Sequence, residues 1–139
     1  MTKIALLTSQ NLENYVIDDE VFFQALNTQT DIEAQWCIWN EDRDWSEFDW
    51  AIVRTTWDYT EQLESFLSVL RAIEASGCQL FNNYNTILWN SNKSYLLELA
   101  RKGLPVIPTA LLKGEDLNSL YDRWGCKKIA YKPLVGASS

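Results

Sequence analysis

The 139-residue sequence predicts an α/β protein whose short parallel sheet is flanked by helices. Short apolar segments of strand length alternate with helical patterns of about 10–15 residues, which is typical of βαβ units. Hydrophobic residues make up 47% of the chain, enough for a packed core. A glycine also follows the longest helical pattern, where helix C-termini commonly place one. These observations together indicate a globular α/β fold.

The first half of the chain carries most of the predicted sheet. Residues 3–8 form a continuous apolar run, as a buried parallel strand does. Residues 18–26 have helical spacing, whereas residues 32–39 alternate between apolar and polar side chains. Residues 50–54 form the third predicted strand. The segment 40–48 between the last two strands is expected to be a loop or a single helical turn.

The clearest helix is expected over residues 60–75, with Gly77 at its C-terminus, and it is followed by a short strand at 79–81. After that strand the character of the sequence changes. Residues 83–92 are rich in asparagine and are expected to be turn-like. This segment predicts a division into residues 1–85 and residues 86–139.

The second part of the chain predicts two helices and one strand. Residues 93–102 form a helical pattern that Asn92 is expected to cap and Gly103 to end. Residues 104–110 contain two prolines and should be extended. Residues 116–124 form the other helix, and residues 127–132 form a strand that enters the last loop.

Composition excludes several classes of function. The net charge of −7 disfavours nucleic acid as a partner, although residues 1–75 carry −11 and residues 76–139 carry +4. A mildly basic second part suits a small anionic ligand. No apolar run approaches the roughly 20 residues of a membrane span, so we expect a cytoplasmic protein with no membrane partner. The chain has no histidine, and its three cysteines are far apart, which disfavours a metal site and a disulfide framework.

The C-terminal segment "YKPLVGASS" has the residue types of an anion-binding loop. Lys132 supplies a positive charge, and Gly136 allows backbone N–H groups to approach an oxyanion closely. Ser138 and Ser139 add hydroxyl donors. Taken without context, an exposed strand end is the simpler interpretation of this segment.

Polar and aromatic residues follow the third predicted strand in the stretch "RTTWDY". Open α/β sheets bind ligands at the carboxyl ends of their strands, so Arg54, Trp57 and Asp58 are candidate substrate-binding residues. Arg54 could hold a carboxylate in a bidentate fork, and Asp58 could hold an amine. For Asp58 the favoured alternative is a cap on the following helix, and for Arg54 a structural role remains equally open. The pair Asp18–Asp19 is best explained as helix N-terminal carboxylates.

The stretches "WNSNKSYLLELARKGLPVIPT", "KPLVGASS" and "RTTWDY" together resemble the ATP-grasp superfamily. The resemblance is to a bacterial subgroup similar to glutathione synthetase and to the ATP-grasp protein of cycloserine biosynthesis, and it extends over essentially the whole chain. It implies that residues 1–85 are a Rossmann-like pre-ATP-grasp domain. Residues 86–139 would then be the first part of the ATP-grasp module.

The same resemblance implies an ATP-dependent carboxylate–amine ligase that works through an acylphosphate. Lys93 and Lys132 would reach the ATP phosphates, and the loop from Gly136 to Ser139 would begin the lid over them. The substrates would be a small-molecule carboxylate and an amine, with ATP and Mg²⁺ as cofactors. Such ligases are about twice this long, and the adenine-binding linker, the phosphoryl-contacting arginine and the Glu and Asn metal ligands cannot be located here. The sequence therefore predicts the N-terminal portion of a longer ligase, inactive by itself.

A second class of function stays open at this point. A stand-alone α/β binding or scaffolding domain would act through an acidic surface rich in aromatic residues. In addition, residues from about 91 to 139 are expected to leave apolar surface uncovered, so that they are either mobile or covered by a homodimer partner.

Overall fold

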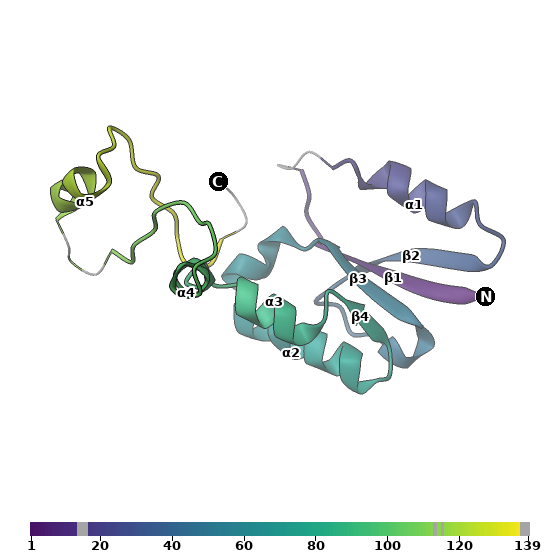
Figure 1. The fold of residues 1–139 in the computed structure, drawn as a ribbon. Helices are drawn as coiled ribbons and strands as arrows, with labels where there is room; N and C mark the ends of the chain where they lie inside the picture. The colour runs from purple at the N-terminus through teal and green to yellow at the C-terminus, as the bar shows by residue number, and fades with distance from the viewer. Residues whose placement is uncertain (14–16, 113, 115, 137–139) are drawn as a thin grey trace. The chain divides into compact units, whose positions relative to one another are not determined.

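The structure is a computed structural model that describes residues 1–13, 17–112, 114 and 116–136. It divides into two compact units, Met1–Leu88 (unit 1) and Trp89–Ser139 (unit 2). Figure 1 shows a parallel sheet with helices in unit 1 and shorter helices joined by irregular segments in unit 2. The α/β fold class predicted from the sequence is confirmed.

The four strands of unit 1 form one parallel sheet in the order β2-β1-β3-β4. They are β1 (Thr2–Thr8), β2 (Ile32–Ile38), β3 (Trp50–Thr55) and β4 (Gln79–Phe81). β1 lies in the interior of the sheet, and its residues 4–8 are buried, as the continuous apolar run predicts. The four strands predicted within residues 1–85 are therefore confirmed.

Two helices of unit 1 cover opposite faces of this sheet. α2 (Leu63–Ala75) packs the main core against one face through Phe66, Leu70 and Ile73. α1 (Asp19–Asn27) packs on the other face, where its partly buried Phe22 and Phe23 contact a smaller core of β1 and β2 residues. Single-turn 3₁₀ helices η1 (Trp45–Glu47) and η2 (Trp57–Glu61) flank β3.

A further helix, α3 (Tyr84–Asn90), forms where the sequence predicts turns. Side chains accept hydrogen bonds from backbone N–H groups in the first turn of α3. Asn83 Oδ1 accepts from Thr86 N at 2.9 Å, and Glu74 Oε1 accepts from Tyr84 N at 2.9 Å. Asparagine is favoured both in turns and at helix N-termini, so the composition alone did not separate the two. The turn prediction is wrong for residues 84–90, whereas Ser91 and Asn92 form a turn and a bend.

Unit 2 contains the helices α4 (Tyr95–Arg101) and α5 (Leu117–Trp124). Ser94, and not Asn92, is the residue before α4, and the Asn92 side chain instead accepts from Ser94 N at 3.0 Å. α5 begins as predicted, because Asp116 Oδ1 accepts from Asn118 N at 3.1 Å. It ends at Gly125, whose φ of 58° is left-handed.

The strand predicted at residues 127–132 is not formed, which corrects the sequence analysis. A strand needs a neighbour for its backbone N–H and C=O groups. Within the described part of unit 2 no second strand is available to pair with it. The local sequence was therefore insufficient to predict a strand here.

Unit 2 buries little apolar surface. Among its described residues, Leu120 is the one hydrophobic side chain that is buried, whereas Ile107 is 84% and Tyr131 79% exposed. Within the described ranges, no helix of the chain has the length and apolar character needed to cross a membrane.

Candidate functional site

The carboxyl ends of β1 and β3 meet at the point where the connections of the sheet change direction. From β1 the chain passes to β2 on one side, whereas β3 lies on the other side of β1. Doubly wound sheets bind ligands at such topological switch points. Buried hydroxyl groups gather here, with the Thr8 and Thr55 oxygens 2.6 Å apart and Ser9 beside them.

Asp58 connects the ends of three elements at this edge. Its Oδ1 accepts from Ser9 Oγ, directly after β1, and from Trp39 Nε1, directly after β2, both at 2.6 Å. Both of these hydrogen bonds are made to Oδ1 of the carboxylate. The helix-cap interpretation of Asp58 is wrong, because Thr56 precedes η2 and Gln62 precedes α2.

Arg54 forms an ion pair with Asp19 in the first turn of α1. Its Nε donates to Asp19 Oδ2 at 3.2 Å, and its Nη2 donates to Asp19 Oδ1. The guanidinium also lies 5.1 Å from the ring centre of Phe22. The bidentate fork expected for a substrate carboxylate is thus occupied by a carboxylate of the protein itself.

The three predicted substrate-binding residues therefore occupy one edge but two sides of the sheet. Arg54 points to the side that α1 covers, and Asp58 contacts Trp39 in the core beneath α2. Trp57 lies between them in the chain and is partly buried. The sequence did not identify Ser9 and Trp39 as partners of Asp58, since they are 49 and 19 positions away. Their one signal was their position, because Ser9 directly follows the first predicted strand and Trp39 is the last residue of the second.

In unit 2, two of the predicted ATP-binding residues contact each other. Lys93 Nζ donates to the Gly136 carbonyl at 2.7 Å, and the backbone N–H of Lys93 donates to the Leu134 carbonyl at 2.8 Å. A Cβ at Gly136 would lie 2.9 Å from Pro133 Cγ, so this close approach favours glycine. Lys132 is exposed. Ser138 and Ser139 lie outside the described residues.

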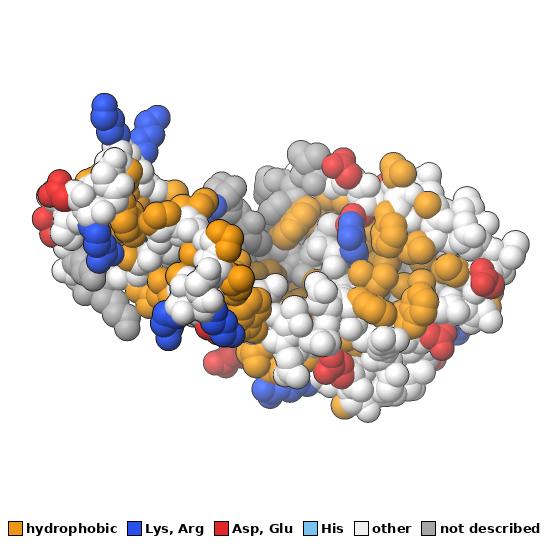
Figure 2. Space-filling view, viewed as in Figure 1, with side chains coloured by type: hydrophobic (Ala, Val, Ile, Leu, Met, Phe, Trp, Pro, Cys, Tyr) orange, Lys and Arg blue, Asp and Glu red, His pale blue; other side chains and the backbone are white. Residues whose placement is uncertain are grey.

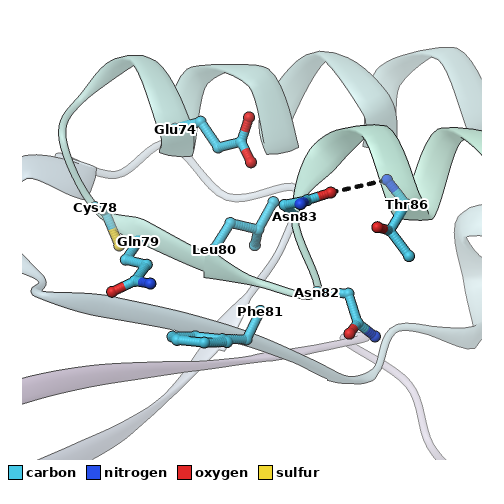
Figure 3. A pocket seen from close by; sticks show the side chains of 8 residues that line it. All are labelled: Glu74, Cys78, Gln79, Leu80, Phe81, Asn82, Asn83 and Thr86. Carbon is cyan, nitrogen blue, oxygen red and sulfur yellow. Dashed lines mark hydrogen bonds between the residues drawn. The ribbon is translucent and has the colours of Figure 1, made fainter.

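An open pocket of about 410 Å³ lies where α2, β4 and α3 meet (Figure 3). Two of its polar side chains already stabilise the fold, because Glu74 and Asn83 accept hydrogen bonds from the first turn of α3. Burial raises the pKa of the Cys78 thiol, which also lines the pocket, to about 11. That thiol stays protonated at neutral pH, so the pocket offers no nucleophile there.

No cluster of three or more Cys, Asp or Glu side chains suited to a metal ion occurs in the described parts of the chain. The candidate residues of unit 1 provide hydroxyls, a carboxylate and a guanidinium, and those of unit 2 provide lysines. These groups can bind and orient charged small molecules.

The fold and the edge of its sheet define an α/β domain of the doubly wound class, with a polar switch-point site between β1 and β3. Residues 4–82, more than half of the chain, match the family described as the D-cycloserine synthetase DcsG, N-terminal domain. The chain belongs to this family.

Two relatives extend the comparison beyond that domain. The cycloserine biosynthesis protein DcsG of Streptomyces lavendulae is 32% identical over 115 residues, which cover 78% of this chain and 38% of that protein. The crystal structure of D-cycloserine synthetase DcsG is similar with a TM-score of 0.67 and 29% identity, covering 88% of this chain and 42% of that one. The chain thus spans about two fifths of the length of the relatives it matches.

Proposed function

We propose that this chain provides the substrate-side domain and the first part of the ATP-grasp module of an ATP-dependent carboxylate–amine ligase. The observation that carries the proposal is the similarity to D-cycloserine synthetase, which extends past the family domain to 88% of the chain. Residues 1–85 would form the substrate side and residues 86–139 the nucleotide side. A reaction that consumes ATP would take place in the cytoplasm, with neither a membrane nor nucleic acid as a partner.

The chemistry we propose has two steps. A substrate carboxylate oxygen attacks the γ-phosphorus of ATP, so that the bond to ADP breaks and an acylphosphate forms. An amine then attacks the acyl carbon, phosphate leaves, and the amine nitrogen loses a proton. The ring of D-cycloserine contains an amide-type C–N bond, which is the kind of bond that such a reaction forms.

Lys93 and Lys132 would neutralise charge on the ATP phosphates in this reaction. The contact between Lys93 Nζ and the Gly136 carbonyl supports this assignment, because it brings the lysine to the loop proposed to cover the phosphates. Ser138 and Ser139 would extend that loop. Mg²⁺ would supply further charge neutralisation when bound with ATP, but we assign no described residue as its ligand.

On the substrate side, Oδ2 of Asp58 would accept a hydrogen bond from the amine. Ser9 and Trp39 hold Oδ1 of the same carboxylate and so fix its orientation. Arg54 would bind the substrate carboxylate through the donors that Asp19 leaves unused, and Trp57 would provide an apolar wall. The substrate would then lie across the edge of the sheet.

The test uses the product of the complete open reading frame with ATP, Mg²⁺ and the ring-opened acid of D-cycloserine, labelled with ¹⁸O in its carboxylate. An acylphosphate transfers one carboxylate oxygen to phosphate, so the released phosphate should carry one ¹⁸O per turnover. Lys93→Met should lower kcat/KM by about 10²-fold or more, because a phosphate-binding charge is lost. Lys127→Met, at an exposed position of the same unit, is the matched control. Absence of nucleotide binding, or turnover without transfer of the label, would contradict the proposal.

A further inference from the structure

The guanidinium of Arg54 is held by α1 on two sides. Asp19, in the first turn of α1, accepts hydrogen bonds from its Nε, at 3.2 Å, and from its Nη2. Phe22 lies three residues further along the same helix, and the centre of its ring is 5.1 Å from Arg54 Cζ. A single helix therefore fixes one edge and one face of a planar group that β3 supplies.

Asp19 is the buried member of this ion pair. Its side chain is 12% exposed, whereas the side chain of Arg54 is 38% exposed. The bonds from Nε and Nη2 use one edge of the guanidinium. The other edge, between Nη1 and Nη2, is of the kind that binds a carboxylate end-on. One guanidinium can thus hold the carboxylate of Asp19 on one edge and a ligand carboxylate on the other.

The ion pair lies at the edge of the sheet that contains the switch-point site. α1 connects the carboxyl end of β1 to the amino end of β2, so its first turn lies toward the carboxyl ends of the strands (Figure 1). Arg54 is the next-to-last residue of β3, which ends at the same edge. Figure 2 shows basic and acidic side chains among hydrophobic ones on the visible face of unit 1.

We propose that Asp19 is a positioning residue, which fixes the guanidinium of Arg54 so that the Nη1–Nη2 edge faces the substrate carboxylate. This inference rests on the proposed function, in which Arg54 binds that carboxylate. A long side chain that is ordered before binding loses less conformational entropy when the ligand arrives. Without Asp19, the substrate itself would have to order Arg54, and its affinity would fall.

Loss of Asp19 has two opposing effects on affinity. Its negative charge repels a substrate carboxylate, so removal of the charge alone would strengthen binding. Removal of its hydrogen bonds frees Arg54 and weakens binding. Salt separates the two effects, because the Debye length is about 3 Å at 1 M ionic strength and repulsion across a partly exposed site is screened. The orienting hydrogen bonds act at contact distance, so their effect should dominate at 1 M NaCl.

The test compares Asp19→Ala with Asp18→Ala in the product of the complete open reading frame. Asp18 is the adjacent residue, is exposed and forms no side-chain cap, so each variant loses one negative charge at the start of α1, but Asp19→Ala also frees Arg54. The probe is the ring-opened acid of D-cycloserine, titrated without ATP at 1 M NaCl by ligand-observed NMR. We expect its Kd to rise about three- to tenfold in Asp19→Ala and to stay at the parent value in Asp18→Ala.

A double-mutant cycle tests whether Asp19 acts through Arg54. In an Arg54→Ala background, Asp19→Ala should leave the Kd of the acid unchanged, because no guanidinium remains to be oriented. Asp19→Asn keeps the shape and one acceptor oxygen, so it replaces Asp19→Ala if that variant does not fold, and its Kd should rise less. In turnover, Asp19→Ala should raise KM for the acid and not KM for ATP, whereas a purely structural role would lower the amount of active enzyme and hence kcat.

Three results would overturn the proposal. Asp19→Ala and Asp18→Ala could give the same Kd, Asp19→Ala could have the same effect with and without Arg54, or the parent chain could fail to bind the acid. Binding of the acid requires no phosphoryl transfer. A parent chain that binds the acid but transfers no ¹⁸O to phosphate would contradict the proposed acylphosphate chemistry, and the Kd values would still decide the role of Asp19.

Discussion

Asp58 accepts hydrogen bonds from two residues that lie far from it in the chain. Trp39 is fully buried and Ser9 nearly so, and both direct their polar hydrogen to the same carboxylate oxygen. A charged acceptor strengthens such bonds, and a buried donor that loses its acceptor is costly. The carboxylate therefore fixes the ends of β1 and β2 against η2, in addition to any role toward a ligand.

Replacing Asp58 with alanine should lower the free energy of unfolding by about 2–4 kcal/mol, because the Trp39 and Ser9 donors lose their acceptor. Asp58→Asn keeps an oxygen at that position and should cost about 1 kcal/mol. Urea unfolding measures both variants. Glu61→Ala, at an exposed acid of the same 3₁₀ helix, is the control and should be close to neutral. Equal losses for Asp58→Ala and Glu61→Ala would contradict this role.

The buried thiols predict how stability depends on pH. Burial raises the pKa of Cys78 from 9.0 to about 11, with Asp49 and Cys37 adding to the effect, and burial also raises the pKa of Cys37. A raised pKa in the folded state means that the contribution to stability is complete below pH 9 and is lost as pH rises from 9 to about 11.

Unfolding in urea at successive pH values should show this loss of stability. Titration of Cys78 should raise the unfolding equilibrium constant by at most about 100-fold. Cys78→Ala should flatten the profile between pH 9 and 11. A parent chain whose stability is constant over that interval would show that the thiols titrate alike in the folded and unfolded states.

The sequence predicted some site residues and missed others for a definite reason. Arg54 and Asp58 were identified because they lie at the carboxyl end of a strand and just after it, where α/β sheets place ligands. Asp19 was assigned to a helix terminus, which is correct, but its ion pair with Arg54 joins positions 35 apart and depends on how α1 packs. Contacts at such separations are set by tertiary packing, which local patterns do not encode.

At the level of elements, the sequence predicted helices with a strong apolar pattern, which make their backbone hydrogen bonds internally, and strands that pair within a buried sheet. β1 and α2 have strong apolar patterns and formed where expected. The segment 127–132 was also predicted to be a strand, but the described part of unit 2 offers no neighbouring strand. α3 was missed because its start depends on Glu74, ten residues earlier in the chain.

The hydrogen bond of the Asn83 side chain at the start of α3 should contribute to stability. Asn83→Ala removes the acceptor of the Thr86 N–H and should destabilise unit 1 by about 1 kcal/mol. Asn83→Asp retains a side-chain acceptor and should be nearly neutral. Urea unfolding followed by circular dichroism gives both values. An unchanged stability in Asn83→Ala would show that solvent replaces the cap without cost.

At the scale of the whole molecule, the two units differ in the apolar surface that they bury. Unit 1 has cores on both sides of its sheet, whereas Leu120 is the buried hydrophobic side chain in the described part of unit 2. The free energy of local opening should therefore be much lower in unit 2.

Hydrogen exchange followed by mass spectrometry should detect this difference. We expect amides of residues 104–112 and 127–136 to exchange at least about 100-fold faster than those of β1 and α2. These two segments lie outside the helices and strands and keep exposed side chains such as Ile107 and Tyr131. Uniform protection along the chain would indicate that unit 2 is covered in solution.

The strand order also bears on how the protein is made. Each strand after β1 pairs with one that the ribosome has already synthesised: β2 and β3 join β1, and β4 joins β3. The sheet can therefore grow outward during translation, because none of the four described strands has to be inserted between two that already pair. β1, the most buried strand, emerges first and must wait for both neighbours, so the nascent chain exposes its most apolar segment until residue 55 has been added.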